Sequence, residues 1–179
     1  MSEFEYLLSF YGLLLGLSVA NVATGFADMW RARSETAVGW CTPLLALYVL
    51  LASSGAWINL WNSRAEETVA AGPLLLSLAH FFPIIFISRA MFPRSGDGWS
   101  SLEDYYMAHR RVLVGAVIAT RLVGAAGLIV AGEWPGWLAG AYLAARLALL
   151  TTMLLVGSVW LHRAGWAAIC LGVVWMLFA

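Results

Sequence analysis

The sequence contains no lysine and few charges of any kind. Its 179 residues include ten basic residues, all arginine, and ten acidic ones, so 11% of the chain is charged and 62% is hydrophobic. Soluble domains average about 25% charged and about 45–50% apolar residues. This chain therefore has too little polar surface for a water-soluble globule, and its mean hydropathy of +0.82 indicates an integral membrane protein. The zero net charge gives no argument for nucleic acid as a partner.

Cysteine and histidine are also scarce. Cys41 and Cys170 lie in separate apolar segments without CxxC spacing, which excludes a disulfide framework and a thiolate metal site. We expect both to be buried small hydrophobic residues. We count His80 as the one membrane-embedded histidine, so we predict no haem, metal or other cofactor. The N-terminal MSEFEY has no basic residue, unlike a secretory signal, so we expect the first apolar segment to be retained.

Long apolar runs dominate what is present. A transmembrane helix needs about 20 such residues, and the candidates lie at approximately 6–27, 40–61, 70–91, 111–131, 137–160 and 164–179. They predict an all-α membrane protein, a six-helix transmembrane bundle forming a single domain over residues 1–179. The last run is the shortest, so five spans with an interfacial tail is the alternative. Ser2-x-x-Glu5 and Ser100-x-x-Glu103 fit capping boxes at the starts of the first and fourth helices.

The positions of the arginines predict an orientation. Seven arginines fall in the linkers on one side, and one falls on the other, so the positive-inside rule places both termini outside. Tryptophans near the span ends fit an interfacial aromatic belt. Three spans followed by three from opposite sides is also the topology of a 3+3 inverted repeat, for which the internal sequence similarity is slight. The seven arginines are Arg31, Arg33, Arg89, Arg94, Arg110, Arg111 and Arg163, against Arg64; the tryptophans are Trp30, Trp40, Trp61, Trp99, Trp134, Trp137, Trp160 and Trp166.

Two stretches resemble a known group of proteins. YGLLLGLSVANVATGF at 11–26, followed by WRAR, resembles the start of a family of small uncharacterised bacterial multi-span membrane proteins. The FP pair at 92–93 and DYYMAHRR at 104–111 are similar to the central loop of that family. The resemblance implies a multi-pass protein of the bacterial inner (plasma) membrane. It implies no activity.

Two arginines fall inside the apolar runs. Arg121 lies about ten residues beyond Arg110 and Arg111, or roughly 15 Å deep, and Arg146 lies about 14 Å from the opposite face. Both therefore approach the midplane on neighbouring antiparallel spans. The acidic residues all lie in termini, linkers or span ends. An intramembrane arginine costs about 2.5–3.5 kcal/mol on insertion scales and usually marks a functional site. We predict an anion site, although bracing of backbone carbonyls, or an acid from another chain, would also satisfy the charges.

Other polar residues are candidates for the same site. His80 falls near the depth of the arginines, and Tyr142 precedes Arg146 by one helical turn. Asn21 and Asn59 lie on polar strips of the first and second spans, where interhelical hydrogen bonding is the alternative role. Arg110 and Arg111 are candidates for binding anionic lipid head groups at the membrane surface. The same pair is also typical of an ordinary positive-inside anchor.

Three functions remain open on the sequence. The first is a small channel or transporter with a midplane site for an anion, carboxylate or phosphate group. The second is an accessory or assembly subunit of a larger membrane complex, whose charges pair with another membrane subunit. The third is an enzyme acting on a lipid head group, which the sequence disfavours because it shows no catalytic set. A bundle of this size leaves little room for a wide pore of its own, so we expect a homo-oligomer among the membrane lipids.

Overall fold

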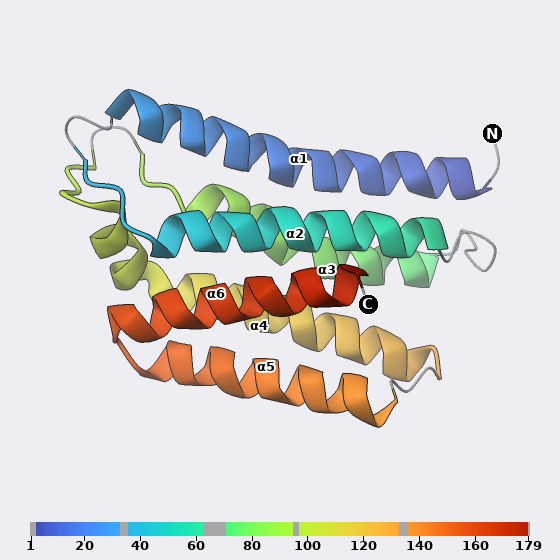
Figure 1. Ribbon diagram of the computed structural model, residues 1–179. Helices are drawn as coiled ribbons and strands as arrows, with labels where there is room; N and C mark the ends of the chain where they lie inside the picture. The colour runs from blue at the N-terminus through green and yellow to red at the C-terminus, as the bar shows by residue number, and fades with distance from the viewer. Residues whose placement is uncertain (1–2, 33–35, 63–70, 95–96, 133–135, 179) are drawn as a thin grey trace.

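The computed structural model describes residues 3–32, 36–62, 71–94, 97–132 and 136–178, and six α-helices account for nearly all of them (Figure 1). Within these ranges the β-type pairing is limited to an isolated bridge between Ala37 and Ser101. The all-α prediction is therefore confirmed. The helices are α1 (Glu3–Ala32), α2 (Cys41–Asn62), α3 (Ala71–Ala90), α4 (Leu102–Val130), α5 (Trp137–Leu155) and α6 (Val159–Phe178).

Five of these helices are long and apolar enough to cross a membrane. They are α1, α2, α4, α5 and α6, and together they indicate a multi-pass membrane protein. The prediction that the last segment is the weakest span is wrong, because α6 has 20 residues and is long and apolar enough to cross a membrane. The shorter apolar stretch is in α3, where it covers Leu74–Ala90.

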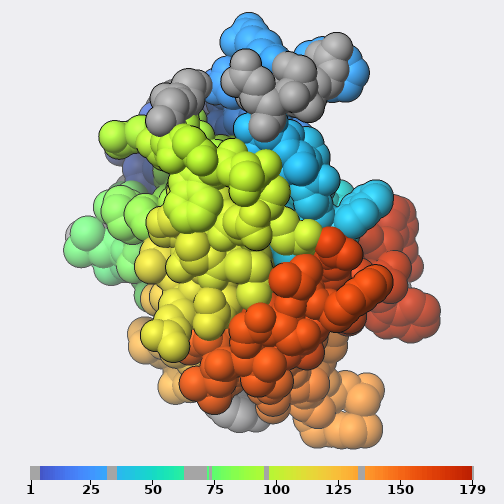
Figure 2. All heavy atoms as spheres, turned by 90° about the vertical axis from the view of Figure 1, so that its left-hand side faces the viewer, coloured from blue at the N-terminus to red at the C-terminus, as the bar shows by residue number. Residues whose placement is uncertain are grey.

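The helices run back and forth along one direction, so both termini lie at the same end of the bundle (Figure 1). Helix α1 packs on α2 and α3, α2 packs on α6, and α3 packs on α4. Helix α5 lies at the lower edge in Figure 1, where it packs on α4 and α6. Figure 2 shows the opposite end, where the α3–α4 connection and the start of α4 (yellow-green) lie beside the start of α6 (orange-red).

The start of α4 differs by one residue from the predicted capping box. The N-cap is Ser101, whose Oγ accepts a hydrogen bond from the backbone N–H of Asp104 at 3.0 Å. Ser101 Oγ also donates to Asp104 Oδ2 at 2.6 Å. The predicted pair used Ser100 and Glu103; instead Ser100 only supports the Asp104 carboxylate, at 3.2 Å. Ser2, of the other predicted box, lies outside the described residues.

The boundary between the last two helices also differs from the prediction. Helix α5 ends at Leu155 rather than near residue 160, and α6 begins at Val159 rather than at 164. Val156 is extended, with φ −98° and ψ 124°, and the Gly157–Ser158 pair completes the turn. Glycine and serine are poor helix formers and favour turns. Arg163 and His162 therefore belong to the first turns of α6 and not to a linker.

Large apolar side chains cover the outer surface of the bundle, as expected where helices face lipid. Leu13, Trp137 and Leu171 are examples, each more than 70% exposed. Most described belt tryptophans are exposed at or near helix ends, including Trp30 and Trp160. The prediction for Trp166 is wrong, because this side chain is fully buried. Trp134, Arg33 and Arg64 lie outside the described residues.

Candidate functional site

Arg121 and Arg146 meet at the ring of one tyrosine. Arg121 on α4 donates a hydrogen bond from Nη2 to the Tyr48 hydroxyl at 2.8 Å. Its Cζ lies 5.6 Å from the centroid of the Tyr48 ring, and Cζ of Arg146 on α5 lies 6.0 Å from the same centroid. Tyr48 itself is buried, with 1% exposure. Three helices thus bring two like charges to one aromatic ring, whose negative face partly offsets them.

Tyr142 completes this group from the preceding turn of α5. Cζ of Arg146 lies 5.3 Å from the Tyr142 ring centroid, as the spacing of four residues predicts. A Cβ atom built on Gly172 of α6 would lie 2.5 Å from the Tyr142 hydroxyl. Only glycine therefore leaves room for this hydroxyl between α5 and α6. We call Tyr48, Arg121, Tyr142 and Arg146 the arginine cluster.

The arginine cluster holds several buried polar atoms without a hydrogen-bond partner. They are Nε of Arg121, Nε and Nη2 of Arg146, and the hydroxyl of Tyr142. Arg146 is only 8% exposed. The described residues offer neither guanidinium a carboxylate partner; their ion pairs are Arg31 with Asp28 and Arg163 with Glu103. An unsatisfied buried group costs about 1–3 kcal/mol, and a charged one costs more. This arrangement can gain free energy by accepting a negative group.

A chain of buried aromatic groups extends from Tyr48 into α6. The Tyr48 and Trp166 rings lie 5.4 Å apart between centroids, and Trp166 Nε1 donates to the Tyr106 hydroxyl at 2.7 Å. The same hydroxyl shares a hydrogen bond with Nδ1 of His162 at 2.7 Å, and His162 Nε2 lies 3.1 Å from the Val156 carbonyl oxygen. Sequence analysis missed this chain and treated His80 as the one embedded histidine. The spacing of four residues between His162 and Trp166 places both on one face of a helix, and this pattern could have indicated the chain.

His80 and Asn59 line a separate cavity next to the arginine cluster. The cavity has a volume of about 300 Å³ and lies between α1, α2, α3 and α4. His80 Nδ1 is buried there without a hydrogen-bond partner. Tyr11 and Ser77 also line the cavity, and their hydroxyls lie 2.5 Å apart. The structure therefore brings these two predicted residues to one cavity and not into direct contact with Arg146.

Asn21 has a different neighbour. Its Nδ2 donates to the Ser88 hydroxyl at 3.0 Å, and Ser88 in turn donates to the Ile85 carbonyl oxygen at 2.7 Å. This contact joins α1 to α3 and corresponds to the interhelical role that was the alternative for Asn21. Neither the arginine cluster nor the cavity includes it.

The two surface arginines of α4 point to different surroundings. Arg110 Nη1 donates to the carbonyl of Met107 at 2.8 Å, and a Cβ on Gly157 would lie 3.2 Å from Arg110 Nη2. Arg110 thus packs against the α5–α6 connection, whereas Arg111 is exposed. Binding of an anionic lipid head group by Arg110 and Arg111 stays a prediction.

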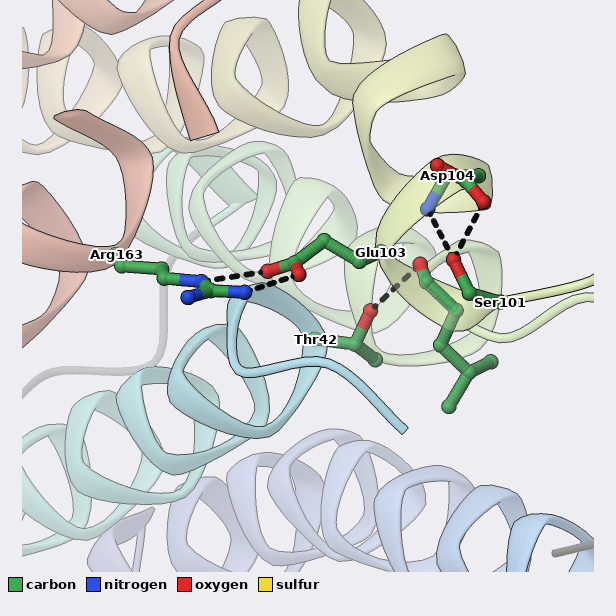
Figure 3. A network of polar contacts seen from close by, with 6 residues as sticks. Thr42, Ser101, Glu103, Asp104 and Arg163 are labelled. Atoms are coloured by element: carbon green, nitrogen blue, oxygen red, sulfur yellow. Dashed lines mark hydrogen bonds and ion pairs between the residues drawn. The ribbon is translucent and has the colours of Figure 1, made fainter. Parts of the chain in front are cut away.

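An ion pair closes the end of the bundle opposite the termini. Both carboxylate oxygens of Glu103 receive hydrogen bonds from Arg163, with Nε to Oε1 at 2.9 Å and Nη2 to Oε2 (Figure 3). A Cβ on Gly39 would come within 2.5 Å of Glu103 Cβ, so the chain entering α2 passes directly beside this pair. Thr42 makes a longer contact with the Leu102 carbonyl at 3.5 Å. These contacts hold the starts of α2, α4 and α6 together.

Comparison with known proteins gives no relative for this arrangement. No family model, curated protein or solved structure matches the chain.

Proposed function

We propose that this protein is a small membrane channel or transporter with an anion site at the arginine cluster. The observation that carries the proposal is the pair of guanidinium groups at Tyr48. Both have unpartnered donors, and neither has a carboxylate partner among the described residues. A bound anion would offset the repulsion between Arg121 and Arg146 and accept their free hydrogen bonds. The planar fork of arginine suits carboxylate and phosphate oxygens in particular.

An accessory or assembly subunit is the second candidate. In that case, an acidic side chain of another membrane protein would supply the negative group. The position of Arg146 on α5, at the edge of the bundle, favours this candidate. The exposure of Arg146, only 8%, weighs against this candidate, because a partner helix would need to reach a side chain that is already buried beside Tyr48 of α2. A small anion needs less space, so we rank the channel or transporter first.

Thermal unfolding in detergent tests the anion site directly. The protein is melted in chloride, phosphate and small carboxylates, together with the Arg121→Gln and Arg146→Gln variants. A ligand at a hundredfold excess over Kd stabilises the folded state by about 2.7 kcal/mol, which is easily measured. We expect the wild type to respond to at least one anion and both variants to lose that response. Arg31→Gln is the control, since this side chain is 79% exposed on the surface.

The same experiment separates the alternatives. If the arginines only brace the bundle, each Gln variant loses stability in every buffer, with no dependence on the anion. Equal melting of wild type and variants across all anions would overturn the anion site and favour the accessory subunit. Flux of the stabilising anion into proteoliposomes, present for the wild type and absent for Arg146→Gln, would then establish transport.

The setting of the protein is also a proposal. We propose that it resides in the inner membrane of a bacterium with both termini outside, on the basis of the arginine distribution. The common end of the two termini in Figure 1 is compatible with this orientation. The 3+3 inverted repeat stays a prediction with little support. In the first half the first helix, α1, packs on both α2 and α3, whereas in the second half the middle helix, α5, packs on both α4 and α6. The two halves are therefore packed differently.

We further propose a homo-oligomer. A six-helix bundle of 19.5 kDa encloses little space of its own, and a permeation path between subunits would avoid this limit. Crosslinking in native membranes is the test. Recovery of monomer alone would contradict the proposal, while leaving the anion site itself open to the melting experiment.

A further inference from the structure

The cavity beside the arginine cluster is open at one end. Three of its lining residues are exposed, namely Asn59 near the end of α2, Leu76 near the start of α3 and Leu128 near the end of α4. Tyr11 and Phe81, which also line it, are buried. Since α2 and α4 end, and α1 and α3 begin, at the end of the bundle that carries both termini, the cavity belongs to that end (Figure 1).

His80 and Gly124 form the part of the wall that lies toward the arginines. A Cβ built on Gly124 would lie 3.1 Å from His80 Cε1 and 3.3 Å from its Nδ1, so the ring sits directly against the α4 backbone. Arg121 is one turn before Gly124 on the same side of α4, and its charge acts on the His80 ring. The imidazole thus lies next to both the cavity and Arg121. Its Nδ1 is buried without a hydrogen-bond partner, while the ring also lies beside the backbone of Thr120.

We infer that this cavity is the entrance to the arginine cluster, from the end that carries both termini, and that it admits small organic monocarboxylates. The inference rests on the proposed anion site. A ligand enters past Asn59 and Leu128, and its carboxylate reaches Arg121 when the His80 side chain turns aside. Because Gly124 has no side chain, the His80 ring can pack against the α4 backbone at this position.

The lining of the cavity indicates this class of ligand. A volume of about 300 Å³ lies at the lower end of the range of small-molecule pockets, about 300–1,000 Å³. Its polar groups are neutral hydroxyl, amide and imidazole groups, so they cannot compensate several negative charges of a polyvalent anion. Leu76, Val123 and Leu128 provide apolar contacts that a short hydrocarbon tail can use and that chloride or phosphate cannot. An acid of the size of lactate fits both conditions.

Blocking the mouth of the cavity tests the entrance. Leu128→Cys is modified with a benzyl thiosulfonate, and Val130→Cys is treated in the same way as the matched control. Val130 is 83% exposed on the same helix and does not line the cavity. Both native cysteines are buried, so their reaction is minor. We expect lactate to raise the melting temperature of wild type and modified Val130→Cys but not of modified Leu128→Cys. An equal rise in melting temperature with lactate in all three proteins would contradict the proposal that this cavity is the entrance.

Narrowing the inner wall gives a second measurement. Gly124→Ala pushes against the His80 ring, whereas a Cβ at Gly115 on the same helix meets nothing within 4 Å. We expect Gly124→Ala to change the rate at which lactate binds severalfold and Gly115→Ala to leave that rate unchanged. Equal binding rates in the two variants would show that the ring does not control access.

Failure of the entrance and failure of the anion site are distinguishable. If no anion stabilises the wild type, the anion site itself is wrong. If lactate stabilises the wild type and Arg121→Gln removes the effect, but modified Leu128→Cys responds fully, only the entrance is wrong. Stabilisation by chloride, phosphate or citrate as strong as that by lactate would overturn the assignment of the ligand class.

Discussion

The hydroxyl of Tyr142 on α5 packs directly against Gly172 on α6. Any residue with a Cβ atom at position 172 would collide with this hydroxyl. A Cβ at this glycine would lie 2.5 Å from the hydroxyl oxygen and 3.2 Å from Cε2 of the ring. Tyr142 also places its ring 5.3 Å from Cζ of Arg146. The packing of α6 on α5 therefore decides where one wall of the arginine cluster lies.

We expect Gly172→Ala to displace Tyr142 and to disturb Arg146 through it. Overpacking of this kind costs about 1–3 kcal/mol. Gly140→Ala on α5 is the control, because a Cβ there meets nothing within 4 Å and alanine favours the helix by up to about 1 kcal/mol. Thermal unfolding should show a lower melting temperature and a weaker anion response for Gly172→Ala alone. An unchanged anion response would mean that Tyr142 has no part in the site.

The Tyr106 hydroxyl predicts a second stability effect. Tyr106→Phe removes the acceptor of the Trp166 indole and the partner of His162 Nδ1, leaving two buried nitrogen atoms unsatisfied. Each such group costs about 1–3 kcal/mol, so we expect a clear loss of unfolding free energy. Tyr6→Phe serves as the control, since that side chain is 48% exposed. Equal unfolding curves for the two variants would argue against the hydrogen bonds at Tyr106.

The ion pair of Glu103 and Arg163 predicts that the stability losses of single variants at these two positions are not additive. We expect Glu103→Gln and Arg163→Gln each to lower the melting temperature, because each leaves a partly buried charge without its partner (Figure 3). The double variant should lose less than the sum of the single losses. A double-mutant cycle by thermal unfolding measures the coupling, and strict additivity would show that the ion pair contributes nothing.

The orientation in the membrane can be tested with two cysteines placed at described, exposed positions. Ser100→Cys lies at the end that holds the α3–α4 connection, and Ala131→Cys lies at the end that carries the termini. The native cysteines are buried, which keeps the background low. In intact cells, a membrane-impermeant thiol reagent should label Ala131→Cys and leave Ser100→Cys unreacted. The reverse pattern would invert the proposed topology.

The sequence predicts the number and order of the helices because the apolar runs are long and the linkers hold the charges. Counting residues from the ends also places Arg121 and Arg146 at similar depth, and the structure has both near Tyr48. The aromatic chain through Trp166 and His162 could not be predicted in this way. A tryptophan near a helix end fits both an interfacial belt and the interior, and the rotation of α6 decides between them. That rotation follows from the turn at Gly157, which starts α6 five residues earlier than the hydropathy indicates.

The position of α5 has a mechanical consequence. Arg146 belongs to a helix at the edge of the bundle, while Arg121 belongs to α4, so the electrostatic repulsion acts across the seam between these helices. We therefore expect neutralisation of these charges by a bound anion to favour closer packing of α5 on α4. A pair of spin labels on the outer surfaces of α4 and α5 would measure the separation of these helices. A shorter distance in the presence of the anion would then indicate that the site is occupied.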